Sequence, residues 1–177
     1  SVGVNFSNLN NPTAFIIPHN ISSLENYNSI ADKNGNLLFY MTGYEPGTIP
    51  NTFYFMKIFN SQHLLMENSD SILTDISETQ GTIFIPFPNE INKYYVFHKQ
   101  LWTGGTSLYY SIIDLSFNNG LGKVVSKNNL LSSNYFDEKL IAVKHGNGLD
   151  WWIITHLANS DKFNIYLINS SGISTPI

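Results

Sequence analysis

Val96-Phe97-His98 is a short apolar and aromatic stretch with two counterparts, Leu38-Phe39-Tyr40 before it and Ile154-Thr155-His156 after it. The three stretches begin at positions 38, 96 and 154, so the two intervals between them are equal. Self-similarity at a fixed interval marks a chain made of repeated units, none of which buries its apolar face without a neighbour. Three units of this length would occupy nearly all of the 177 residues. The interval therefore predicts one domain, residues 1–177, built from three repeats.

The second repeat, residues 81–138, shows the content of a unit most clearly. Its apolar segments are rich in β-branched and aromatic residues, as strands are. Glycine, asparagine and proline, which favour turns, separate these segments. The unit therefore predicts four strands, at Gly81 to Phe87, Tyr94 to His98, Leu108 to Leu115 and Gly122 to Ser126.

The other two repeats follow the same order. The third, residues 139–177, predicts strands at Lys139 to His145, Trp151 to His156, Phe163 to Asn169 and Gly172 to Ile177. The first, residues 22–80, is the loosest copy and predicts strands at Asn28 to Ala31, Asn36 to Met41, Thr52 to Phe59 and Gln62 to Met66. Residues 1–21 are expected to add one or two strands that complete a neighbouring blade.

Four-stranded units of about 40 to 60 residues are the blades of a β-propeller, which protects its sheet edges by radial repetition. The predicted fold is therefore all-β, a β-propeller-like array of about three four-stranded blades. Propellers usually close with at least four blades. We therefore expect the array to be part of a larger propeller, with further blades in the same chain or in another copy; a sandwich of the repeats is the alternative.

The composition narrows the possible partners. Only 12% of residues are charged and the net charge is −4. All nine basic residues are lysines, so the chain lacks the side chain that reads phosphates and guanine edges, and nucleic acid is not an expected partner. No apolar run reaches about 18 residues, so no membrane span is expected. The absence of cysteine excludes disulfides and thiolate metal sites.

Three segments, 31–40, Tyr110 to Asn128 and Glu138 to His156, carry a resemblance to a known family. They resemble the N-terminal propeller-like region of large exported proteins of Bacteroidetes, often described as gliding-motility-associated proteins or type IX secretion substrates. The resemblance covers roughly residues 25 to 175, and the segment between Gly43 and Gln80 departs from it. It implies a secreted or cell-surface location and a propeller-like architecture, and it implies no particular chemistry.

The turn from Asp32 to Asn36 has two interpretations. Asp32, Asn34 and Asn36 place oxygen-bearing side chains at alternate positions around a glycine, as the first half of a calcium loop does. The closing carboxylate would fall at Thr42, which has none. A hairpin turn between two strands accounts for the same residues. We therefore expect a turn with no metal or cofactor, and calcium remains the weaker alternative.

His98 and His156 occupy the same place in consecutive repeats, where two imidazoles would converge on one ligand. Tyr40 stands at the corresponding place in the first repeat, so the position requires a planar side chain with a polar tip. A hydrogen bond between strands or blades needs only that. We expect this structural role ahead of ligand binding.

The tryptophans add one candidate ligand-binding residue and one constraint on the fold. Trp102, beside two glycines, is expected in a loop, where an exposed indole would stack on a sugar or on a partner's side chain. Trp151 and Trp152 are neighbours on one strand, so they face opposite sides of a sheet, and both sides are expected to be covered. The candidate ligand-binding residues are thus Trp102, His98 and His156.

No catalytic signature stands out. Glycosidases require a pair of carboxylates about 5 to 10 Å apart. The acidic residues of this chain mostly flank turns, so no such pair is predicted. No serine lies in a Gly-x-Ser-x-Gly elbow. We expect a non-catalytic binding or scaffold module of a secreted or cell-surface protein, with a glycan or a protein as its ligand. The alternatives are a carbohydrate-active enzyme, with two acids meeting in a cleft, and a structural spacer in an adhesin.

Overall fold

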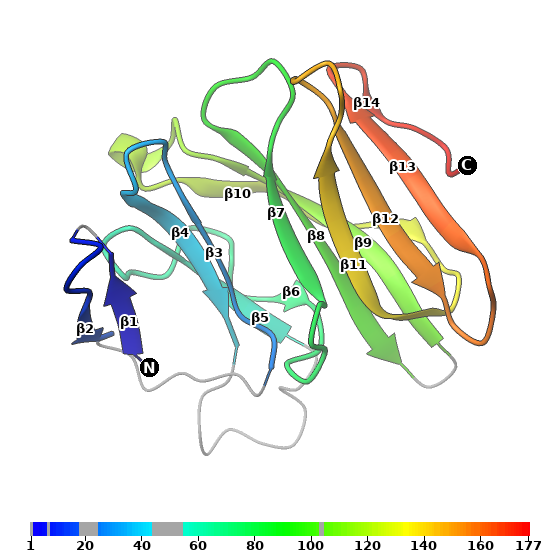
Figure 1. Ribbon diagram of the computed structural model, residues 1–177, viewed down its shortest axis with the longest axis horizontal. Helices are drawn as coiled ribbons and strands as arrows, with labels where there is room; N and C mark the ends of the chain where they lie inside the picture. The colour runs from blue at the N-terminus through cyan, green and yellow to red at the C-terminus, as the bar shows by residue number, and fades with distance from the viewer. Residues whose placement is uncertain (1, 7, 18–24, 44–54, 103–104) are drawn as a thin grey trace.

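The computed structural model describes residues 2–6, 8–17, 25–43, 55–102 and 105–177, and β-strands dominate it (Figure 1). The strands form three four-stranded antiparallel sheets and one two-stranded sheet. Among the described residues, the only helical element is the short 3₁₀ turn Asn118–Gly120, so none of them forms an apolar helix of membrane-spanning length. The all-β class predicted from the sequence is confirmed.

Each four-stranded sheet is a meander in which strands that follow one another in sequence lie side by side. The first sheet holds β3 (Asn28–Ala31), β4 (Leu37–Thr42), β5 (Phe55–Asn60) and β6 (Ile72–Leu73). The second holds β7 (Thr82–Pro86), β8 (Lys93–Trp102), β9 (Gly105–Asp114) and β10 (Lys123–Ser132). The third holds β11 (Phe136–Lys144), β12 (Trp151–Leu157), β13 (Phe163–Asn169) and β14 (Gly172–Ile173). The three equally spaced stretches lie on β4, β8 and β12, the second strand of each sheet.

The fourth strand of the first sheet differs from the sequence-based prediction. The strand predicted at Gln62 to Met66 is instead largely a turn after β5, because the Asn60 side-chain oxygen accepts hydrogen bonds from the backbone N–H groups of Gln62 and Leu64. A single bridge joins Leu65 to Phe59. The strand that pairs with β5 is β6, only two residues long.

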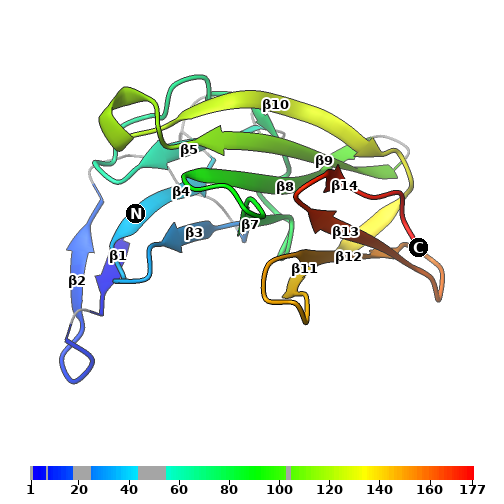
Figure 2. The ribbon, with the colours of Figure 1, turned by 90° about the horizontal axis from the view of Figure 1, so that it is seen from above.

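The two opening segments pair with each other. β1 (Val2–Asn5) and β2 (Thr13–Ile16) form an antiparallel hairpin that lies beside the first sheet (Figure 2). Ile17, directly after β2, packs against a small apolar cluster formed by Tyr40 and Phe59 of the first sheet. This contact helps to hold the hairpin against that sheet.

The second sheet lies between the other two and contributes one face to each of two cores (Figure 1). Val96 and Phe84 belong to the core shared with the first sheet, where they meet Phe39, Met41 and Met56. The opposite face belongs to the core shared with the third sheet, whose members include Tyr95, Phe97, Leu140, Ile153 and Tyr166. Burial of these apolar side chains holds the three sheets together.

The third sheet has a second apolar face, directed away from the second sheet. Cross-strand pairing places seven large apolar side chains on it, from Ile141 and Val143 on β11, Trp152 and Ile154 on β12, and Phe163, Ile165 and Leu167 on β13. Ile141 is 53% exposed, Val143 43% and Phe163 55%. The expectation that both sides of the Trp151–Trp152 strand are covered is thus met on only one side by the described residues.

Candidate functional site

His98 joins the first sheet to the second. Its Nδ1 lies 2.6 Å from the carbonyl oxygen of Leu73 on β6, and its Nε2 lies 2.9 Å from the Ser111 hydroxyl on β9. Because the carbonyl only accepts, Nδ1 carries the proton and the Ser111 hydroxyl donates to Nε2. The ring is fully buried, and this burial lowers the pKa of His98 to about 4.

Asn128 extends this connection between the two sheets. Its backbone N–H donates to the Ser111 hydroxyl, its side-chain oxygen accepts from the Leu73 N–H, and its side-chain nitrogen donates to the Ser71 carbonyl. Asn128 has a φ of 58°, in the left-handed region that asparagine tolerates. The side chains of His98 and Asn128 together tie the edge of the first sheet to the second.

His156 lies in a different setting from His98. It shares a face of β12 with Trp152 and Ile154, directed away from the second sheet, whereas His98 points toward the sheet that precedes its own. Its Nδ1 lies 2.5 Å from the Asp137 carboxylate on β11. The two histidines thus contact different partners on different sheets, and the structure does not bring them to one point.

The three planar residues at the repeat interval do share one feature. Each lies opposite an aromatic residue on the third strand of its sheet. Ring centroids are 5.5 Å apart for Tyr40 and Phe59, 5.9 Å for His98 and Tyr109, and 4.8 Å for His156 and Phe163. Cross-strand aromatic pairs of this kind stabilise sheets.

The remaining predicted residues lie at the end of β8 and in the turn between β3 and β4. Trp102 was expected in a loop, but it is the last residue of β8 and its backbone pairs with Gly105, while its side chain lies outside what the structure describes. The Asp32 carboxylate accepts hydrogen bonds from the backbone N–H groups of Asn34 and Asn36 and from the Asn36 side chain, which lower its pKa. Gly35 has a φ of 83°, as the hairpin turn requires. The Asp32 carboxylate is thus engaged in closing the turn between β3 and β4.

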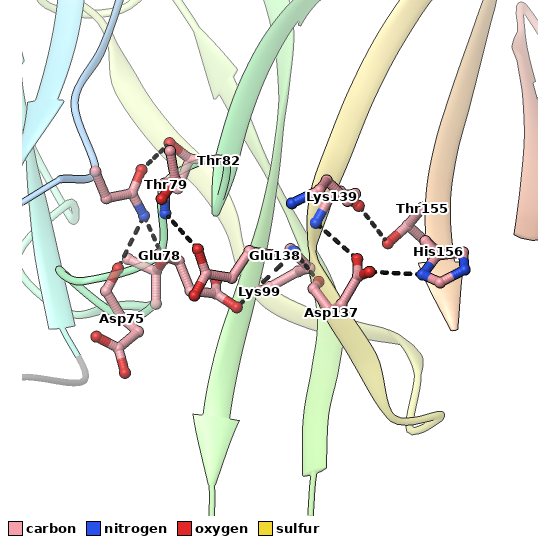
Figure 3. Close-up of polar contacts among 12 residues, drawn as sticks. Asp75, Glu78, Thr79, Thr82, Lys99, Asp137, Glu138, Lys139, Thr155 and His156 are labelled. Atoms are coloured by element: carbon pink, nitrogen blue, oxygen red, sulfur yellow. Dashed lines mark hydrogen bonds and ion pairs between the residues drawn. The ribbon is translucent and has the colours of Figure 1, made fainter. Parts of the chain in front are cut away.

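A buried polar cluster, which sequence reasoning missed, links all three sheets (Figure 3). Lys99 lies near the end of β8 with no exposed surface, and its Nζ donates to the Asp137 carbonyl at 2.5 Å. The same nitrogen lies 3.8 Å from Oε1 of Glu78, in the connection between the first and second sheets. Glu138, beside Asp137, accepts a hydrogen bond from the Thr79 N–H.

The electrostatics of this cluster are dominated by burial. Burial raises the pKa of Glu78 to about 7, Lys99 opposes that rise, and the carboxylates of Asp75, Glu138 and Asp137 add to it. Burial likewise lowers the pKa of Lys99, against the attraction of Glu78. The second carboxylate oxygen of Glu78 is buried without a hydrogen-bond partner among the described residues. Because Glu78 and Lys99 are almost completely buried, the pair connects the sheets and is not presented to a substrate at the described surface.

A shallow pocket of about 300 Å³ opens between the turn after β7 and the turn after β11. Its lining includes Ile91 and Glu90 on one side and Leu149, Lys144 and Trp151 on the other. The Lys144 ammonium lies 4.2 Å from the Trp151 ring centroid and also donates to the Leu149 carbonyl. One face of the indole is therefore already covered by the protein's own cation.

Comparisons with known proteins give no relative: no family model, no curated protein and no solved structure matches the chain. A function for this chain must therefore be inferred from its residues and their geometry.

Proposed function

We propose that this chain is a non-catalytic scaffold and binding module, a section of a β-propeller-like array in which four-stranded sheets stack face to face. The observation that carries the proposal is the exposed apolar face of the third sheet. In accordance with the resemblance of its sequence, we place the module in a secreted or cell-surface protein.

The three sheets support this proposal by their order. Each is a meander of four antiparallel strands, and the first strands β3, β7 and β11 follow one another across the stack (Figure 1). Radial repetition of such sheets is the arrangement that propellers use. A stack of three leaves two end sheets, and each end sheet has one face without a four-stranded partner among the described residues.

The composition of the third sheet favours another sheet as the occupant of its exposed face. Ile141, Val143, Ile154, Ile165 and Leu167 are aliphatic, and comparable side chains fill the two internal cores. Exposed apolar patches of this kind mark interaction sites. A further sheet of the same type, in the same chain or in another copy, would bury this face as the second sheet buries the other.

The test compares the protein with an Ile141→Asp/Val143→Asp variant by sedimentation velocity and by binding of a hydrophobic dye. A surface that accepts a sheet predicts dye binding or self-association by the parent, and loss of both in the variant. Val125→Asp is the matched control, because Val125 on β10 is 41% exposed, close to the 43% of Val143, and lies on another sheet. A monomeric parent that binds no dye would refute the proposal.

A further inference from the structure

A groove with a volume of about 1310 Å³ lies between the β1–β2 hairpin and the first sheet. The hairpin contributes Phe6 and Phe15, and the first sheet contributes Tyr40 together with the strand β3. Ligand pockets commonly hold about 300 to 1,000 Å³. The groove is therefore large enough for a ligand with several linked units.

Charge distinguishes this groove from the rest of the surface. The chain has nine lysines and thirteen acidic residues, yet none of the described residues that line the groove is a lysine, an aspartate or a glutamate. Its polar groups are the imidazole of His63 and amides and hydroxyls that include those of Asn5, Asn28, Asn34, Asn36, Ser29 and Ser61. Such groups donate and accept hydrogen bonds at once, as the hydroxyls of a sugar do. The side-chain nitrogens of Asn28 and Asn36 already donate within the protein, to the Thr82 carbonyl and the Asp32 carboxylate. A cationic ligand would find no carboxylate among these lining residues, and an anionic ligand would find no lysine.

Exposed aromatic rings are the second feature of the groove lining. Phe6 is 61% exposed and Tyr27 is 53% exposed, and both line the groove. Exposed rings of this size present large flat apolar surfaces. The combination of flat rings with uncharged hydrogen-bonding groups matches the alternating apolar and hydroxyl faces of a pyranose ring.

Three further rings in the groove, those of Phe15, His63 and Tyr40, contact one another in series. Ring centroids are 6.1 Å apart for Phe15 and His63 and 5.7 Å apart for His63 and Tyr40, and Nδ1 of His63 lies 3.2 Å from the Tyr40 hydroxyl. His63 has a φ of 62°, a conformation uncommon for residues other than glycine. This series of rings joins the hairpin to the sheet.

The groove also differs from the exposed face of the third sheet. That face is formed by seven large apolar side chains, whereas the groove lining combines apolar side chains with amide and hydroxyl groups. Packing of another sheet would bury those polar groups away from water, which costs free energy unless each finds a partner. A ligand rich in hydroxyls offers both donors and acceptors to this lining.

We propose that this groove binds a neutral oligosaccharide, with Phe6 and Tyr27 as stacking surfaces and the surrounding asparagines and serines as hydrogen-bonding groups. The inference rests on the proposed binding role and names its ligand class, but it uses a surface separate from the face of the third sheet. Failure at the groove would therefore leave the Ile141 and Val143 test unaffected.

The experiment titrates the protein with cellohexaose, maltohexaose and mannohexaose, and with hexagalacturonate as an anionic counterpart, by calorimetry and by chemical-shift perturbation. We expect at least one neutral hexasaccharide to bind and hexagalacturonate to bind at least tenfold more weakly. Tyr27→Ala should weaken binding roughly two- to tenfold, the range of a single aromatic contact. Tyr135→Ala is the matched control, because Tyr135 is 49% exposed and lies outside the groove.

Three results would overturn the proposal. The first is no binding of any of the three neutral hexasaccharides at millimolar concentration, and the second is equal binding of hexagalacturonate. The third is an equal loss in the Tyr27→Ala and Tyr135→Ala variants. Sedimentation velocity separates the rival occupant: a self-association that Tyr27→Ala and Phe6→Ala abolish, without sugar binding, would assign the groove to a second copy of the chain.

Discussion

The ammonium nitrogen of Lys99 lies 3.8 Å from Oε1 of Glu78, and neither side chain has appreciable contact with water. Lys99 belongs to β8 in the second sheet, Glu78 lies in the connection from the first sheet, and the carbonyl that Lys99 also contacts belongs to Asp137 of the third. Removal of one partner of a buried ion pair is strongly destabilising, because the other charge is then buried without a counterion. The pair therefore helps to fix the position of the three sheets relative to one another, at the place where Lys99, Glu78 and Asp137 meet.

Removal of Lys99 should be strongly destabilising. Lys99→Met leaves the Glu78 carboxylate buried without its cation, and we expect a loss of about 3 to 5 kcal/mol at pH 8. The loss should be smaller at pH 5, because Glu78, whose pKa is already raised to about 7, then takes up a proton. Urea denaturation at the two pH values measures both effects.

Two further variants separate pairing from packing at this site. Glu78→Leu/Lys99→Met removes both charges and should recover much of the lost stability. Lys123→Met breaks the exposed ion pair of Lys123 with Glu67, whose atoms lie 2.7 Å apart, and should cost far less stability than Lys99→Met, because water screens an exposed pair. Equal losses for Lys99→Met and Lys123→Met would contradict the assigned role of the buried pair.

His98 should make the protein sensitive to acid. The pKa of His98 is lowered from 6.5 to about 4 in the folded state, so its contribution to stability is present above pH 6.5 and is lost as the pH falls through 4. Complete loss of this contribution lowers the free energy of unfolding by on the order of 3 kcal/mol. Unfolding free energies at pH 7, 5.5 and 4.5 measure it in the parent and in His98→Gln, which does not titrate.

The comparison with His98→Gln is needed because Glu78 changes the stability with pH in the opposite direction. Its pKa is raised from 4.5 to about 7, so its contribution is present below pH 4.5 and is lost as the pH rises through 7. Subtracting the unfolding free energy of the variant from that of the parent at each pH cancels the contribution of Glu78. A difference that does not change between pH 7 and pH 4.5 would show that His98 is not held neutral by burial.

The sequence predicts the strands well and the direction of their side chains poorly. β4, β8 and β12 follow from apolar runs between turn residues, and the repeat interval correctly relates them as second strands. The interval equates His98 with His156, yet one faces the preceding sheet and the other faces away from it. Side chains alternate between the two faces of a sheet along a strand, so a shift of the strand by one residue moves every side chain to the opposite face. The length of the repeat does not reveal whether such a shift has occurred.

The buried cluster and the groove were beyond prediction for different reasons. Lysine and glutamate are almost always exposed, so nothing in the sequence marks Lys99 or Glu78 as buried. The groove combines Phe6 and Tyr27 with residues of the first sheet, and its shape depends on where the hairpin lies. One signal was available: residues 1–17 contain no charged side chain, in agreement with an uncharged groove.

A side chain at Gly81 should destabilise the fold. A Cβ atom there would lie 2.5 Å from the side-chain nitrogen of Asn26 and 2.7 Å from Glu78, and both partners are buried. Asn26 is fixed by hydrogen bonds to Thr74, Thr82 and the Asp75 carbonyl, so it has little room to move. We expect Gly81→Ala to cost about 1 to 3 kcal/mol.

Gly146→Ala is the control for this substitution, because no described atom lies within 4 Å of the added Cβ. Its effect should stay within about 0.5 kcal/mol. Thermal unfolding of both variants measures the difference. A Gly81→Ala variant as stable as Gly146→Ala would mean that Asn26 and Glu78 are less tightly held than the structure indicates.

Truncation of two neighbouring isoleucines on β12 and β11 should change stability by very different amounts, because the two side chains lie on opposite faces of the third sheet. Ile153 has no exposed surface and packs in the core shared with the second sheet, so Ile153→Ala should cost about 2 to 5 kcal/mol. Ile141 is 53% exposed on the outer face, so Ile141→Ala should change the stability of the isolated chain by less than about 0.5 kcal/mol. Chemical denaturation of the two variants tests the assignment of the faces. If a further sheet packs on the outer face in the assembled protein, the cost of Ile141→Ala should rise there to a core-like value, and an unchanged cost would leave that face without a structural partner.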